Sequence, residues 1–175
     1  DYEDMMKLTE DIFNKIAIEL TGGEEIEYQG TKLNMGAPFA RLTMVESIEK
    51  HAGIKIEEDM EIEDIYELAK ENKVDSVNKK MNRGDLINTL FEELVEDKLI
   101  QPTFIYRYPV EISPLSKNSE DDPRYVDRFE LNISCPNTHS GSGELDARRE
   151  NLAQLRSMLG VVFDMISDDQ DLYLK

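Results

Sequence analysis

The sequence predicts an α+β fold in which an antiparallel sheet is flanked by helices. Three observations carry this prediction. Apolar residues recur at helical spacing in several stretches before residue 100. From Pro102 onward, aromatic and β-branched residues dominate two strand-like runs. The last 50 residues then read as strand, loop, helix and strand, which is the order of a βαβ unit.

Four helices are predicted in the first hundred residues. The first spans residues 2–20 and stops at Thr21-Gly22-Gly23. The second spans residues 44–52, because Thr43 and Glu46 have the spacing of a capping box. The third and fourth are predicted from apolar stripes over residues 62–69 and from about residue 84 to 95.

The predicted strands begin with a short hairpin. Residues 26–28 and 32–35 flank a tight turn at Gln29-Gly30. Two longer strands follow at residues 103–108 and 125–133, on either side of a polar loop. The closing βαβ unit adds a helix over residues 145–166 and a strand over residues 172–174.

These elements suggest three regions. Residues 1–42 and 100–130 form the sheet region, residues 43–99 form a helical insertion, and residues 129–175 form the closing strand-helix-strand segment.

The charge balance excludes one broad class of function. The chain has 38 acidic and 20 basic residues, a formal net charge of -18 and a pI of about 4.4. Broad electrostatic binding to nucleic acid or to an anionic membrane needs clustered Lys and Arg. We therefore interpret most of the charge as solvated helix faces.

Cysteine and histidine usage limits the remaining chemistry. The single cysteine, Cys135, has no disulfide partner in the chain, and His51 and His139 are too far apart in sequence to suggest a metal site. No apolar run approaches the roughly 20 residues that span a bilayer, and the acidic start does not resemble a signal peptide. We expect no membrane partner and a cytoplasmic location.

Four blocks of sequence carry a family resemblance: DYEDMMKLTEDIF, PFARLTMVESIEK, KLIQPTFIYRYPVEISPLSK and DPRYVDRFEL. Through them, residues 1–130 resemble the class II lysyl-tRNA synthetase catalytic domain after its second motif. The resemblance implies an antiparallel sheet with flanking helices, the cofactors ATP and Mg²⁺, the substrates lysine and tRNA, and a homodimer. It also implies that Glu130 is the carboxylate that helps to hold ATP through a metal ion.

Much of that family's active site is missing from the sequence. The arginine-bearing second motif would precede Asp1, the third would lie downstream, and the run that grips lysine is replaced by NISCPNT. Formation of lysyl-adenylate needs cationic side chains that contact the ATP phosphates and acidic side chains that contact the lysine ammonium group. Without them, the reaction lacks electrostatic stabilisation. We expect a partial lysyl-tRNA synthetase domain that is inactive alone.

A second resemblance starts near residue 129. ELNISCPNT and the terminal DLYLK are similar to parts of a dihydroorotate dehydrogenase, a flavin enzyme on a (β/α)8 barrel. That family implies FMN, with Cys135 as catalytic base, Asn132 and Asn137 bonding the pyrimidine and flavin, and Lys175 beside the flavin ring. A thiol acts as a base only where its pKa is brought near the working pH, and a lone cysteine is more often a small buried apolar residue.

The two resemblances meet inside one predicted strand. Glu130 and Leu131 fit either, whereas natural fusions join whole domains through polar linkers. The sequence therefore suggests a chimaera or a composite chain. Three functions stay open: a partial lysyl-tRNA synthetase, a fragment of an FMN-dependent dihydroorotate dehydrogenase, and a non-catalytic scaffold or interaction domain.

Overall fold

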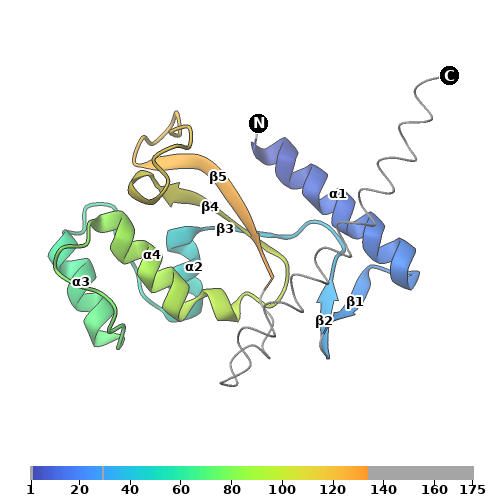
Figure 1. Cartoon of the computed structure of the whole chain (residues 1–175), viewed down its shortest axis with the longest axis horizontal. Helices are drawn as coiled ribbons and strands as arrows, with labels where there is room; N and C mark the ends of the chain where they lie inside the picture. The colour runs from blue at the N-terminus through green and yellow to red at the C-terminus, as the bar shows by residue number, and fades with distance from the viewer. Residues whose placement is uncertain (1, 29, 134–175) are drawn as a thin grey trace. The chain divides into compact units, whose positions relative to one another are not determined.

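The computed structural model describes residues 2–28 and 30–133, and Figure 1 shows how their elements are arranged. The predicted α+β fold class is confirmed. The elements in chain order are α1 (Tyr2–Thr21), β1 (Glu25–Tyr28), β2 (Thr31–Asn34), β3 (Ala40–Thr43), α2 (Met44–Ala52), α3 (Ile62–Glu71), α4 (Arg83–Leu94), the 3₁₀ helix η1 (Glu96–Lys98), β4 (Thr103–Pro109), the 3₁₀ helix η2 (Val110–Ile112) and β5 (Tyr125–Asn132).

The strands form two small sheets. β1 and β2 pair as the predicted antiparallel hairpin, whose turn contains Gly30 at a φ of 79°. The second sheet has the order β3-β4-β5 and is mixed, because β4–β5 is antiparallel and β3–β4 is parallel. The prediction of an antiparallel sheet is thus corrected at β3. A parallel neighbour needs a long crossover, and here the helices α2, α3 and α4 provide it.

An irregularity in β4 decides which face of the sheet its side chains occupy. The register with β5 shifts between Tyr106 and Tyr108, and the intervening Arg107 has a φ of 56°. As a result, Tyr106 packs in the cluster that includes α1, whereas Tyr108 packs in the cluster that includes α2–α4.

Both faces of the three-stranded sheet are covered. Successive strand residues point to opposite faces, and the neighbours Phe104 and Ile105 are both 0% exposed. Phe104 belongs to a cluster with residues of α1, β2 and the segment before β3. Ile105, Tyr108 and Val126 belong to the larger cluster, which contains the buried residues of α2, α3 and α4. The helices between residues 43 and 99 therefore share a core with β4 and β5.

A buried carboxylate on α1 binds both the segment that precedes β3 and β3 itself. Glu10 is 4% exposed and accepts a hydrogen bond from the Phe39 backbone N–H at 3.0 Å. The Arg41 guanidinium donates to both Glu10 oxygens at 3.3 Å. The charge is thus paired and hydrogen-bonded, as a buried carboxylate requires.

The capping box predicted for α2 is confirmed. The Glu46 N–H donates to Thr43 Oγ1 at 3.1 Å, and the Thr43 N–H donates to the Glu46 carboxylate at 2.8 Å. We expect Thr43→Ala to lower the free energy of unfolding by about 1 kcal/mol, because an N–H of the first turn loses its acceptor. Urea denaturation measures this. Thr43→Ser keeps the acceptor and serves as control, and an alanine variant as stable as the native chain would contradict the role of the cap.

Some predictions reach beyond the described residues. Strand β5 confirms the first strand of the predicted βαβ unit, but the helix over residues 145–166 and the strand over residues 172–174 lie outside the described part. The βαβ unit and the three predicted regions therefore stay predictions. In residues 2–28 and 30–133, no helix combines the length and the apolar character needed to cross a bilayer.

Candidate functional site on strand β5

Glu130 lies near the end of β5, on the outer strand of the mixed sheet. Its backbone is paired with Ile105 of β4, the central strand. The carboxylate side chain is 44% exposed, so it is reachable from solvent although its backbone is fixed by the sheet. This placement gives a rigid support to an oxygen ligand.

Two neighbours orient the Glu130 carboxylate. The Tyr108 hydroxyl donates to Glu130 Oε2 at 3.0 Å, and the Arg128 guanidinium donates to Oε1. Arg128 is itself held, since it donates to Ser113 Oγ at 2.6 Å and its guanidinium carbon lies 4.5 Å from the centre of the Tyr108 ring. Arg128 thus stacks on one partner of Glu130 while bonding Glu130 directly.

Burial and charge act together on this cluster. Burial raises the pKa of Tyr108, and the neighbouring Glu130 charge and hydrogen bond raise it further. The phenol therefore stays protonated near neutral pH and remains a donor to Glu130. Burial also raises the pKa of Glu96, with Glu92, Asp97 and Glu130 acting in the same direction. Negative charge is thus concentrated between η1 and β5, and Arg128 is the cation that contacts Glu130.

The second predicted site residue on β5 is Asn132. It is paired with Thr103 and lies two residues from Glu130, so their side chains leave the same face of the strand. Its Nδ2 atom is buried and, among residues 2–28 and 30–133, has no hydrogen-bond partner. Cys135, Asn137 and Lys175 lie outside the described residues, as does His139.

The described residues do not form a complete metal centre by themselves. Within residues 2–28 and 30–133, no three side chains from His, Cys, Asp and Glu are grouped to hold an ion. The carboxylate of Glu130 is a suitable oxygen donor for Mg²⁺. It supplies one ligand, and both of its oxygens already accept hydrogen bonds from Arg128 and Tyr108.

Comparison with known proteins decides the family. A family model described as "tRNA synthetases class II (D, K and N)" matches residues 1–169. The chain belongs to this family. It is 48% identical over 133 residues to the lysine–tRNA ligases of Bacillus thuringiensis (strain Al Hakam) and Bacillus anthracis, and 49% identical over 133 residues to that of Bacillus mycoides (strain KBAB4). Each match covers 76% of this chain and 26% of the ligase.

The chain therefore spans about a quarter of the length of these curated relatives. The class II match also extends past Glu130 to residue 169, over most of the segment that resembles a dihydroorotate dehydrogenase in sequence. The comparisons give no support to a dehydrogenase origin or to a chimaera. The lysyl-tRNA synthetase resemblance is supported, at the level of the class II family and its lysine–tRNA ligase relatives.

Within this class II chain, three residues of the cluster around Glu130 were not predicted: Arg128 and Tyr108, which contact Glu130, and Ser113, which contacts Arg128. Arg128 could have been found, because residues two apart on a strand share a face and opposite charges there attract. Tyr108 and Ser113 could not, because the irregularity at Arg107 and the turn after η2 decide where they lie.

Proposed function

We propose that this chain is part of the catalytic domain of a lysine–tRNA ligase, which activates lysine with ATP and transfers it to tRNA. The supporting observation is the 48% identity over 133 residues to lysine–tRNA ligases, within a class II family match over residues 1–169. Of the three functions that the sequence left open, this is the one that the comparisons favour.

In this proposal Glu130 contributes one oxygen ligand to Mg²⁺ bound with ATP. Mg²⁺ at such a site would neutralise charge on the phosphates. Tyr108 and Arg128 support this role, because their hydrogen bonds fix the positions of the two carboxylate oxygens. The remaining ligands would come from residues other than the described ones.

The proposal includes inactivity of the isolated chain. Activation of lysine needs cations on the phosphates and acids around the substrate ammonium. Around Glu130, the cation in contact with it is Arg128, and Arg128 is already paired with Glu130. A cytoplasmic location and a homodimer complete the proposal and are supported by the family resemblance.

We expect the purified chain to show no lysine-dependent exchange of pyrophosphate into ATP. The reason is that a quarter of the ligase length supplies too few of the groups that bind ATP and lysine. Full-length Bacillus anthracis lysine–tRNA ligase, assayed beside it, is the positive control. Exchange by the chain that rises with lysine concentration would contradict the predicted inactivity.

A further inference from the structure

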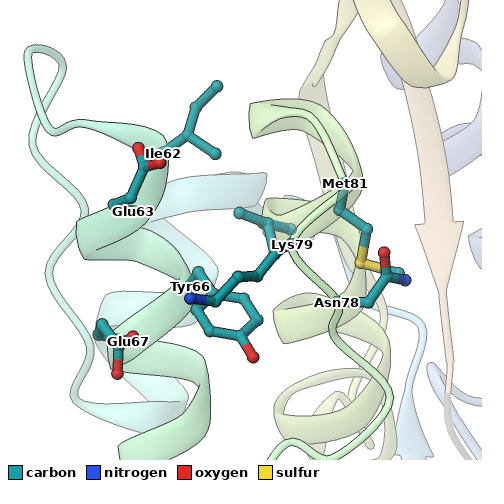
Figure 2. A pocket seen from close by; sticks show the side chains of 8 residues that line it. Ile62, Glu63, Tyr66, Glu67, Asn78, Lys79 and Met81 are labelled. Atoms are coloured by element: carbon teal, nitrogen blue, oxygen red, sulfur yellow. The ribbon is translucent and has the colours of Figure 1, made fainter.

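A shallow groove lies between α3 and the segment that leads into α4, away from β5 (Figure 2). Its volume is about 60 Å³, whereas small-molecule sites usually measure about 300–1,000 Å³. A nucleotide is therefore too large for it, and one aliphatic side chain is a closer match. The groove is lined by Ile62, Glu63, Tyr66, Glu67, Asn78, Lys79, Met81 and Leu86.

Helix α3 has a second apolar row, which the hydrophobic core covers only in part. Ile65 and Ala69 are fully buried in the core with α2 and α4. Ile62 and Tyr66 are also one turn apart, so they form a neighbouring row that faces the groove. Ile62 is 42% exposed, and Tyr66 is half-buried. An exposed isoleucine beside an open groove leaves room for a further apolar contact.

An acidic row runs beside the apolar one. Glu63 and Glu67 are one turn apart and line the groove, and both are exposed. The only basic residue of α3 is Lys70, which pairs with Asp75 at 3.0 Å. Within the described part of the chain, Glu63 and Glu67 have no ion pair. The groove therefore offers two unneutralised carboxylates next to an apolar anchor site.

The groove also holds one cation of its own. Lys79 Nζ lies 5.9 Å from the centre of the Tyr66 ring, and Figure 2 shows its side chain reaching over that ring. The Tyr66 face thus accepts an ammonium group. Lys79 is exposed, and a cation–π contact at an exposed site is weak. A cation of an incoming peptide can therefore replace Lys79 over the Tyr66 ring.

We propose that this groove is a docking site for a basic peptide segment of a partner protein, in which one aliphatic side chain is flanked by Lys or Arg. The aliphatic side chain would enter between Ile62 and Met81. The flanking cations would pair with Glu63 and Glu67. Charge complementarity selects this partner, because the carboxylates on the groove outnumber its single lysine and would repel the phosphates of RNA.

The test titrates the isotope-labelled 175-residue chain with the synthetic peptide Lys-Lys-Leu-Lys-Lys and follows its amide NMR signals. Shifts are expected at residues of α3 and at residues 78–86. A peptide with Ser in place of Leu should bind more weakly, since it lacks the apolar anchor. The double variant Glu63→Gln/Glu67→Gln should weaken binding by roughly three- to tenfold, as loss of two exposed ion pairs implies.

Two further variants distinguish peptide docking at the groove from RNA binding and from general attraction to exposed carboxylates. Lys79→Ala removes a like charge, so it should tighten peptide binding, whereas it would weaken RNA binding. Glu19→Gln/Glu27→Gln removes two exposed carboxylates elsewhere and should leave the affinity within about twofold, because exposed distant charges are screened. Peptide-induced shifts that lie outside the groove would overturn the proposal. An equal loss of peptide affinity in the two double variants would also overturn it. So would groove signals that shift with an oligouridylate and not with the peptide.

Discussion

Phe104→Ala is expected to lower the free energy of unfolding by about 3–5 kcal/mol. Phe104 is 0% exposed and lies in the middle of the cluster that joins the sheet to α1 and the hairpin. Its ring centre is 5.8 Å from that of Phe39 and 5.5 Å from that of Phe129, which it meets edge to face. Truncation removes both aromatic contacts and leaves a cavity. Domains of this size are stable by only about 5–15 kcal/mol, so the loss is a large fraction of the total.

Urea denaturation followed by circular dichroism measures this loss. Leu115→Ala is the control, because Leu115 is 101% exposed and should change the stability little. Ile105→Ala tests the opposite face of the same strand and should cost about 2–5 kcal/mol. If either Phe104→Ala or Ile105→Ala behaved like Leu115→Ala, the corresponding face of the sheet would not be covered as described.

Local signals in the sequence predicted most of the described elements. The stop at Thr21-Gly22-Gly23, the capping box at Thr43 and the turn at Gly30 each act within a few residues, and the structure confirms all three elements they delimit. Such signals are readable because capping and turn geometry depend on neighbouring backbone groups.

Non-local pairing explains what the sequence missed. β3 has four residues, too few to show an alternating pattern, and its partner β4 lies about 60 residues further along the chain. Its parallel pairing therefore could not be derived from local patterns, and the predicted sheet was wholly antiparallel. The position of Tyr108 depends in the same way on the irregularity at Arg107.

For the candidate site, the sequence pointed to one candidate side chain on a described strand, Glu130, and not to the residues around it. Glu130 was predicted from the family resemblance, and its role stays a prediction. The structure places its half-exposed carboxylate on a paired strand. Its contacts with Tyr108 and Arg128 come from tertiary structure. The roles suggested for Cys135, Asn137 and Lys175 stay predictions, because these residues lie outside the described part of the chain.

The second large effect is expected when the chain is placed in a whole ligase. In Bacillus anthracis lysine–tRNA ligase, the segment that aligns with this chain over 133 residues can be exchanged for the matching segment of this chain. At 48% identity the substituted segment should keep the fold and the position of the Glu130 carboxylate. Glu130→Gln in that hybrid should lower lysine-dependent exchange by at least about 10- to 100-fold, since loss of a group that only supports a metal ligand already has an effect of this size. Glu19→Gln, on the exposed face of α1, is the matched control.

The most direct measurement is therefore the rate of lysine-dependent pyrophosphate exchange by this hybrid, with and without Glu130→Gln. If the chain is part of a lysine–tRNA ligase, we expect the hybrid to show clear lysine-dependent exchange. The Glu19→Gln variant should have the same exchange rate, and the Glu130→Gln variant a much lower one. A folded hybrid without exchange would contradict the proposed function. Full exchange in the Glu130→Gln variant would contradict the role given to Glu130.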